Sequence, residues 1–272
     1  MESDRLGMVG TALDFIEMHL EDDIALEDVA RAAHYSKYYL HRAFSGVLGT
    51  SLYQYIRRRR LTEAARRLIF SQASLTDLAL AAGYQSQQAF GDAFCAMYKC
   101  PPAEYRRLHV FYPLQLPIRL HPQTALSGIR PAADSDIPAW MTLLSQVVDG
   151  YPRLDEAEHL AWLKARIARK EALLLISGGE AVGAVGFCRD TGCIDYLGVH
   201  PQEHALDVSA HLLQAVRVRL SPQLHLNLTT FRERDPADPG YRSEWKRLGF
   251  QEGELLVEFG YPTQRMIGPV CG

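Results

Sequence analysis

Two segments about fifty residues apart repeat one pattern, and this repeat constrains the fold more than any other feature of the chain. LEDVARAAHYS at residues 26–36 and LTDLALAAGYQS at residues 75–86 share a leucine, an aliphatic residue three positions later, an Ala-x-x-Ala element and a tyrosine, at an offset of 49. Beyond the tyrosine the offset becomes 50, because Ser36 matches Ser86. A chain with such a repeat is expected to contain one structural unit twice.

Each copy has the pattern of a short helix, a tight turn and a second helix. Apolar residues recur at i, i+3, i+4 and i+7, which is the spacing of one buried helix face. A serine opens each second helix, where its hydroxyl can accept a hydrogen bond from a free backbone amide. The sequence therefore predicts two helix-turn-helix motifs, in which four apolar side chains pack each second helix onto its first: Leu40, Phe44, Phe90 and Phe94.

The remaining positions of the second helices carry side chains suited to DNA bases. In the first copy they are Lys37, Tyr38, His41 and Arg42, and in the second copy Gln85, Gln87, Gln88 and Asp92. Arg and Lys donate to guanine acceptors, Gln can form two hydrogen bonds with adenine, and an aromatic ring can contact the thymine methyl group. A generic solvated helix would carry more Glu and Lys and fewer Gln and Tyr. We therefore predict two DNA-recognition helices.

The segment between the copies is predicted to be one long helix. SLYQYIRRRRLTEAARRLIF, residues 51–70, has helical periodicity and would span about 30 Å at 1.5 Å per residue. Two recognition helices at that separation could enter successive major grooves of one DNA duplex. Residues 24–112 hold 12 Lys and Arg against 6 Asp and Glu, whereas residues 113–272 hold 16 against 19, so a polyanion is expected to meet the first segment. The run RRRR at 57–60, taken alone, is more typical of a solvated helix face.

These motifs resemble the DNA-binding domain of the AraC/XylS family of bacterial transcription regulators, in particular its Rob/MarA/SoxS branch. The resemblance covers residues 8–107 and rests on YSKYYLHRAF, SLYQYIRRRRLTEAARRL, the SQQ of GYQSQQAFGDAF, and CPPAEYRR. It implies that Ser36 and Ser86 lie near phosphates at the starts of helices. It also implies that five side chains face base edges: Tyr38, His41, Arg42, Gln87 and Gln88.

Three positions depart from that branch. Tyr38 stands where the branch usually has Trp, His41 where it usually has Gln, and Asp92 where the second helix often has Arg. A carboxylate at position 92 would repel phosphate and could at best accept a hydrogen bond from a cytosine amine. The second motif is therefore expected to bind DNA more weakly or to recognise a different sequence.

The pattern changes after residue 112. FYPLQLPIRLHPQTALSG contains three closely spaced prolines and is predicted to be a stiff linker with one short edge strand. Strands and helices then follow: IRPA, helical stretches near 134–149 and 155–170, ALLLIS, AVGAVGFCR, CIDYLGVH, helix 205–220, LHLNLTT, GYRSEWKRL and GELLVEFG. We therefore predict three parts: an all-α DNA-binding domain at 1–112, a linker at 113–125, and an α+β domain with a mixed central sheet at 126–272.

The α+β domain resembles the GNAT acyltransferase fold over residues 126–268, through GVHP, RLGF and GYPTQRM. In that family the turn after GVHP is glycine-rich and its backbone amides hold the pyrophosphate of acetyl-CoA at a helix N-terminus. The matching positions here are His204, Asp207 and Ser209. A Cβ atom at these positions blocks close approach, and the charge of Asp207 repels phosphate. The alternative is an ordinary helix capped by Asp or Ser whose cofactor loop has been lost, so acetyl-CoA is disfavoured and no cofactor is expected.

The catalytic residue implied by this resemblance is also missing. Trp245 occupies the position of a general-acid tyrosine, an indole cannot protonate a thiolate, and Tyr241 one helical turn earlier is a poor substitute. We predict no catalytic residues and no metal site, although His204, Asp207 and His211 would share a helix face. A cleft for an effector is predicted to be lined by Tyr151, Asp195, Tyr196 and Tyr241.

The sequence thus predicts a DNA-binding transcription regulator, an activator, with a GNAT-like sensor domain. Its expected partners are double-stranded DNA, RNA polymerase and a small-molecule effector. No apolar run is long enough to span a membrane and the N-terminus lacks the features of a signal peptide, so a cytoplasmic protein is expected. Two alternatives remain open: an active N-acetyltransferase fused to the DNA-binding domain, and a C-terminal domain that serves dimerisation alone.

Overall fold

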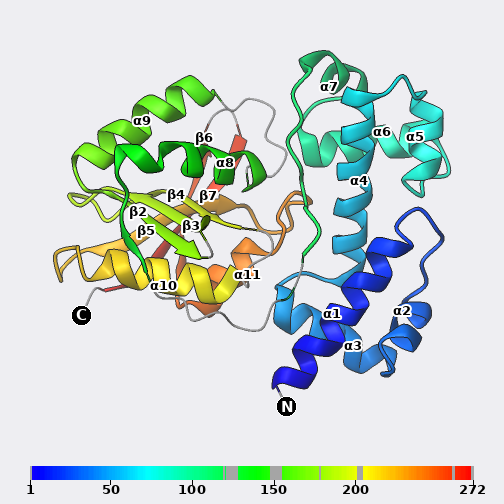
Figure 1. Cartoon of the computed structure of the whole chain (residues 1–272), viewed down its shortest axis with the longest axis horizontal. Helices are drawn as coiled ribbons and strands as arrows, with labels where there is room; N and C mark the ends of the chain where they lie inside the picture. Colours follow the sequence, from blue (N-terminus) through cyan, green and yellow to red (C-terminus); the bar gives the residue numbers. More distant parts are fainter. Residues whose placement is uncertain are drawn as a thin grey trace. The chain divides into compact units, whose positions relative to one another are not determined.

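The chain divides into two compact units (Figure 1), which are described separately. Unit 1 contains the described residues up to 120, and unit 2 the described residues from 128 onward. The computed structural model describes residues 2–118, 120, 128–147, 155–177, 179–200, 205–258 and 261–270.

Unit 1 is helical throughout its regular structure. Its helices are α1 (Glu2–Met18), α2 (Leu26–Ala32), α3 (Lys37–Leu48), α4 (Leu52–Phe70), α5 (Leu75–Ala81), α6 (Gln87–Tyr98) and α7 (Pro102–Leu108). The pairs α2–α3 and α5–α6 are the two predicted helix-turn-helix motifs, and α4 joins them (Figure 1). The predicted all-α domain with two such motifs is confirmed.

The turns of the two motifs share a backbone geometry although their sequences differ. In each turn the amide of the tyrosine donates to the carbonyl five residues earlier, at 3.0 Å for Tyr35 and 2.9 Å for Tyr84. The preceding residue is left-handed, with φ of 60° at His34 and 80° at Gly83. Glycine adopts this conformation freely, whereas for a residue with a Cβ atom it costs about 1 kcal/mol or more of conformational free energy. The second turn then contains one extra residue, Gln85, which explains the change of offset from 49 to 50.

Each recognition helix begins at a serine and buries the predicted apolar face. Ser36 Oγ accepts from the amide of Tyr39 at 3.4 Å, and Ser86 Oγ accepts from the amide of Ala89 at 3.1 Å. Each motif has its own core, formed with α1 and with α7 respectively. Four side chains predicted to face inward have no exposed surface: Leu40, Phe44, Phe90 and Phe94.

Beyond α7 the chain runs as an extended segment beside α4 (Figure 1). We call residues 109–118 the strap. None of its residues forms a strand, and the rest of the segment in which a short edge strand was predicted lies mostly outside the described residues. Its Leu114 is 3% exposed, because this side chain belongs to the core of the second motif.

Unit 2 combines two sheets with four α-helices among its described residues. The strands are β1 (Arg130–Pro131), β2 (Ala172–Ser177), β3 (Glu180–Phe187), β4 (Ile194–Val199), β5 (His225–Phe231), β6 (Gln251–Glu258) and β7 (Tyr261–Val270). The helices are α8 (Ile137–Val147), preceded by the 3₁₀ turn η1 (Asp134–Asp136), α9 (Glu156–Ala168), α10 (Ala205–Arg217) and α11 (Tyr241–Arg247). The predicted α+β class is confirmed.

The first sheet has the order β1-β2-β3-β4 and the second β5-β7-β6, with antiparallel neighbours in both. Among the described residues, a parallel bridge between Cys193 and Asn227 links the two sheets, and it supplies the parallel pairing of the predicted mixed sheet. Side chains alternate across β2. Leu173 packs in the core with α10, while Leu174 packs in the core with α8 and α9 on the opposite face (Figure 1).

One strand of unit 2 was not predicted. β7 lies between β5 and β6, at the centre of the second sheet. Its sequence YPTQRMIGPV contains Pro262 and Pro269, which are unusual in a central strand because proline cannot donate a ladder hydrogen bond. Pro262 is the second residue of β7 and Pro269 its last but one, so most of the ladder is kept. Among the described helices, none is long and apolar enough to cross a membrane.

Candidate nucleic-acid interface

The predicted base-contacting side chains of α3 all lie exposed on one helix. Tyr38 is 74% exposed, and His41 and Arg42 follow it at i+3 and i+4, so the three share a face. Lys37 donates from Nζ to Glu27 Oε1 on α2 at 2.8 Å and lies 5.6 Å from the centre of the Tyr38 ring. This contact lowers the pKa of Glu27. The ammonium group of Lys37 is therefore partly committed to its own motif.

On α6 two of the predicted side chains contact each other. Gln88 Nε2 donates to Asp92 Oδ1 at 2.9 Å, one helical turn away, and both side chains are exposed. A carboxylate can only accept hydrogen bonds, so the amide nitrogen of Gln88 must face Asp92 and its carbonyl oxygen is turned away. Asp92 thus orients Gln88, a role that the sequence did not suggest. Gln85 and Gln87 are exposed beside it, and Gln87 Oε1 accepts from Thr76 Oγ1 at 3.3 Å.

The serines at the helix starts are exposed, as contacts with phosphate would require. Their hydroxyl oxygens accept backbone amides of their own helices, so Ser36 and Ser86 can still donate through O–H. The first amides of α3 and α6 carry the positive end of each helix dipole. Two exposed tyrosines that the prediction did not include lie near this end of α3, Tyr35 and Tyr39, with ring centres 5.5 Å apart.

The arginine run on α4 was predicted as a solvated helix face, and this is wrong for its central pair. Arg58 is 1% exposed and Arg59 is 4% exposed. Arg58 Nη2 donates to the carbonyl oxygen of Leu114 at 2.7 Å, and Arg59 forms an ion pair with Glu17 of α1 at 2.8 Å. Arg58 and Arg59 therefore bind groups of the same domain. In addition, the acidic residues of α1 offset part of the positive charge counted between residues 24 and 112.

Of the four side chains predicted to line an effector cleft, the three that the structure describes lie in different surroundings. Tyr151 lies outside the described residues. Asp195 pairs with Arg166 of α9, and the Tyr196 ring lies in an aromatic cluster with its centre 5.3 Å from that of Trp140. Tyr241 packs instead against the core on the other face of the first sheet.

The altered cofactor loop is described only in part, since His204 and the side chain of Asp207 lie outside the described residues. Helix α10 begins at Ala205, so Asp207 and Ser209 lie inside the helix and not at its cap, contrary to the prediction. Ser209 on α10 and Glu244 on α11 are both buried, at 1% and 5% exposed. Burial raises the pKa of Glu244, and the neighbouring Ser209 hydroxyl opposes the shift.

Trp245 and Tyr241, the two positions considered for a general acid, both pack in or against the core of unit 2. Trp245 is 6% exposed within the core of unit 2, and the Tyr241 ring packs between Phe231 and Trp245 at centre distances of 6.5 and 6.4 Å. No group of three or more potential metal ligands occurs within the residues that the structure describes.

Comparisons with known proteins give separate matches for the two parts of the chain. A model of a helix-turn-helix domain matches residues 29–108. An acetyltransferase of the GNAT family from Bacillus cereus covers 53% of this chain and 96% of its own, with 12% identity and a TM-score of 0.42.

Among curated proteins, the HTH-type transcriptional regulator YbfP of Bacillus subtilis is 39% identical over 98 residues, which are 36% of this chain but only 33% of YbfP. The multiple antibiotic resistance protein MarA of Salmonella typhimurium is 40% identical over 98 residues, which are 77% of its length. The range 29–108 matched by the helix-turn-helix model contains both recognition helices, α3 and α6. The chain therefore belongs to the AraC-type helix-turn-helix family of DNA-binding transcription regulators.

Proposed function

We propose that the chain activates transcription by binding one DNA duplex with α3 and α6 in two successive major grooves, and by contacting RNA polymerase. One observation carries this proposal: the two motifs with the exposed recognition helices α3 and α6 are joined by a single helix, α4. The 19 residues of α4 span about 28 Å, which is close to the roughly 34 Å of one DNA turn. A single chain would then contact two half-sites, without a second copy.

The two recognition faces have different chemistry, so the half-sites should differ in sequence. On α3, Arg42 can donate to guanine and the exposed Tyr38 ring can contact a thymine methyl group. On α6, Gln88 offers its carbonyl oxygen and one N–H, because its other N–H is bound by Asp92. That pair matches an amine next to an acceptor on a base edge, as adenine presents in the major groove.

Arg42→Ala tests the assignment of base contacts. Duplexes selected from a random library by the wild-type chain would supply the specific site. The variant should bind this site about 1 to 3 kcal/mol more weakly and lose preference at one base pair. Arg31→Ala is the matched control, because Arg31 is 76% exposed on α2 of the same motif and lies outside the recognition face. Equal weakening of Arg42→Ala on selected and random duplexes would refute base recognition by Arg42.

Unit 2 is proposed to be a regulatory domain, acting in the cytoplasm, that binds a small-molecule effector and carries no acetyl-CoA chemistry. Two observations support the loss of this cofactor. Asp207 stands where the phosphate-binding turn has glycine, and Ser209 stands at the third position of the same motif, with its side chain 1% exposed. A carboxylate at position 207 repels phosphate, and a Cβ atom at these positions restricts the approach of the pyrophosphate to the backbone amides, so these residues do not fit the cofactor.

Titration of acetyl-CoA into the full chain, with Asp207→Gly in parallel, tests the second part of the proposal. We expect no heat of binding for the natural sequence. Micromolar binding by the natural sequence would support the alternative, an active N-acetyltransferase domain. A two-chain species that requires residues 113–272 would support the other alternative, a domain for dimerisation alone.

A further inference from the structure

The strap is held on α4 by side chains from one face of that helix. Tyr55, Arg58, Arg59 and Thr62 have the i, i+3, i+4, i+7 spacing, and none is more than 4% exposed. They make five hydrogen bonds to the backbone of the strap: Arg58 Nη2 to Leu114 O at 2.7 Å, Arg59 Nη1 to Gln115 O at 3.1 Å, the amides of Leu114 and Gln115 to Thr62 Oγ1 at 3.2 and 3.0 Å, and the amide of Ile118 to Tyr55 Oη at 3.3 Å.

These hydrogen bonds fix the path of the strap, because none of its residues belongs to a β-strand. Backbone groups buried without partners are costly, and in this segment α4 supplies the partners. Thr62 Oγ1 accepts two strap amides while its hydroxyl donates to the carbonyl of Arg58 at 2.9 Å. Pro113 and Pro117 have no N–H, and the residue after each proline donates to α4. One side of the strap is therefore committed to α4.

The strap also connects the cores of the two motifs. Leu114 belongs to the core of the second motif, and Phe111 packs against that core. Ile118 and Leu120, further along the chain, pack against the core of the first motif. The strap thus runs the length of α4 in the opposite direction and links the two motifs a second time.

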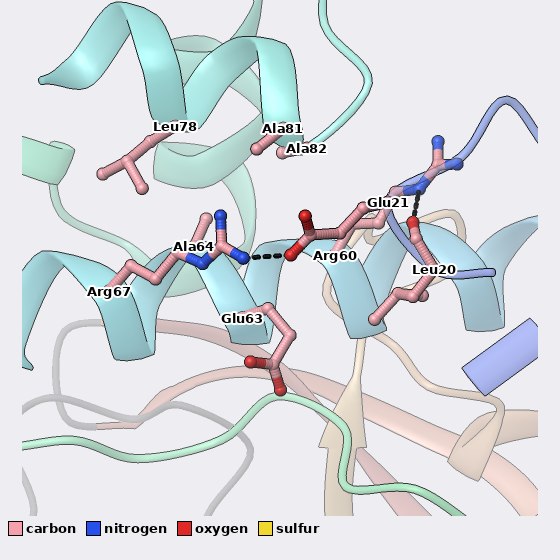
Figure 2. Close-up of a pocket in the computed structure, with 9 residues that line it drawn as sticks. All are labelled: Leu20, Glu21, Arg60, Glu63, Ala64, Arg67, Leu78, Ala81 and Ala82. Carbon is pink, nitrogen blue, oxygen red and sulfur yellow. Dashed lines mark hydrogen bonds and ion pairs between the residues drawn. The ribbon is translucent and has the colours of Figure 1, made fainter. Parts of the chain in front are cut away.

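The face of α4 away from the strap also lies beside segments of both motifs. A groove there is lined by Leu20 and Glu21 after α1, by Arg60, Glu63, Ala64 and Arg67 of α4, and by α5 (Figure 2). Arg60 Nε donates to the carbonyl of Leu20 at 2.9 Å, and Arg67 pairs with Glu21 (Figure 2). On this side, two partly exposed arginines of α4 therefore bind the segment that follows α1.

We propose that the strap is a brace that fixes the separation and the relative orientation of α3 and α6, and that Thr62 and Arg58 are positioning residues for the simultaneous binding of two half-sites. This inference rests on the proposed binding of two successive grooves by one chain. When two linked modules bind one duplex, the second contact gains affinity only if the linkage holds it at the required place. A chain whose strap is released should keep both recognition faces and lose part of this gain.

The test compares Thr62→Val with Thr11→Val in the full chain. Both threonines lie on helices and donate to the carbonyl four residues earlier, at 2.9 Å for Thr62 and 3.1 Å for Thr11, but only Thr62 accepts amides of the strap. Binding is measured on the selected duplex with both half-sites, on the same duplex with one half-site scrambled, and on a duplex with one base pair inserted between the half-sites.

We expect Thr62→Val to weaken binding of the two-site duplex about tenfold, to leave the one-site duplex within about twofold, and to reduce the penalty for the inserted base pair. Thr11→Val should match the wild type on all three duplexes. Unchanged affinity of Thr62→Val for the two-site duplex would overturn the inference. An equal loss of affinity for the two-site and one-site duplexes would also overturn it, because such a loss indicates a smaller amount of folded protein.

Two further controls keep the outcomes distinct. Should Thr62→Val fail to fold, Ile118→Ala loosens the strap at the first motif and leaves the buried face of α4 intact, and the same three duplexes decide the result. A wild-type chain with no preference for the two-site duplex would overturn the proposed two-groove binding itself, and the inference with it. A wild-type preference that neither variant reduces would overturn the inference alone.

Discussion

The contact between Gln88 and Asp92 allows two opposing effects of one carboxylate to be separated. Asp92 accepts a hydrogen bond from Gln88 at 2.9 Å on the exposed face of α6, so it holds the amide in one orientation. It also places a negative charge on a surface that should approach DNA phosphates. Asp92→Asn removes the charge but retains an oxygen that can accept from Gln88, whereas Asp92→Ala removes both.

The magnitudes follow from these two roles. A side chain held in place saves about 0.5 to 1.5 kcal/mol of ordering cost on binding, and a correctly oriented bidentate contact discriminates between bases by about 1 to 3 kcal/mol. Asp92→Ala should therefore lose about 1 kcal/mol of discrimination, or about fivefold, at the base pair that Gln88 contacts. Both variants should bind random duplexes more tightly than the wild type, because a repulsive charge is gone.

Fluorescence anisotropy at several salt concentrations measures both effects, on the selected duplex and on its single-base-pair variants. The expected result is that Asp92→Asn gains affinity on every duplex and keeps its base preference, while Asp92→Ala gains affinity and loses preference at one position. Loss of preference in Asp92→Asn equal to that in Asp92→Ala would refute the orienting role. Unchanged affinity of both variants for random DNA would refute the placement of the Asp92 charge near phosphates.

Three further predictions concern stability. Burial raises the pKa of Glu244 in the folded chain, so the neutral form is favoured and stability is lost as the pH rises from the unfolded pKa through the folded pKa. Glu244→Gln should therefore reduce the pH dependence of the free energy of unfolding, measured by urea titration of the full chain. An unchanged pH dependence would contradict a buried, protonated Glu244. His34 is left-handed with φ of 60°, so His34→Gly should raise the free energy of unfolding by about 0.5 kcal/mol, the steric cost of about 1 to 2 kcal/mol exceeding the entropic cost of glycine. Gly83→Ala should instead destabilise the chain, because φ is 80° and a Cβ atom would lie 2.5 Å from Arg60 Nη1. If His34→Gly and Gly83→Ala shift the midpoint of thermal unfolding in the same direction, the two turns are not equivalent.

The helix-turn-helix motifs could be predicted from sequence because their determinants are local. The serine caps, the apolar spacing and the residues of the turn each act within one or two helical turns, and Ser36, Ser86 and Phe94 have the expected positions. β2 was predicted with its observed bounds for the same reason, since ALLLIS is a continuous apolar strand between two turns.

The features that were missed depend on contacts distant in sequence. Nothing in the run at 57–60 distinguishes the buried Arg58 and Arg59 from the half-buried Arg57 and Arg60, because the burial of the central pair is decided by the strap some 56 residues later. β7 was missed because it is a central strand whose two prolines lie near its ends. The orientation of Gln88 depends on a neighbour four residues away, and the i, i+4 spacing of a donor and an acceptor on one helix could have suggested it.

The internal use of arginines has a consequence for how the chain binds DNA. Of the 12 basic residues between 24 and 112, Arg58 and Arg59 are buried and bound by the strap and α1, while Arg67 and Lys37 form ion pairs with acids of the same domain. Each phosphate neutralised by a protein cation adds about 0.9 to the slope of log K against log salt. The slope should therefore correspond to far fewer than 12 phosphates, and under the proposed two-groove binding we expect the affinity to depend on both half-sites being bound at the correct spacing. A slope near 10 would show that these arginines neutralise DNA phosphates after all. Affinity would then come mainly from charge, and the separation of α3 and α6 that the strap is proposed to fix would contribute little.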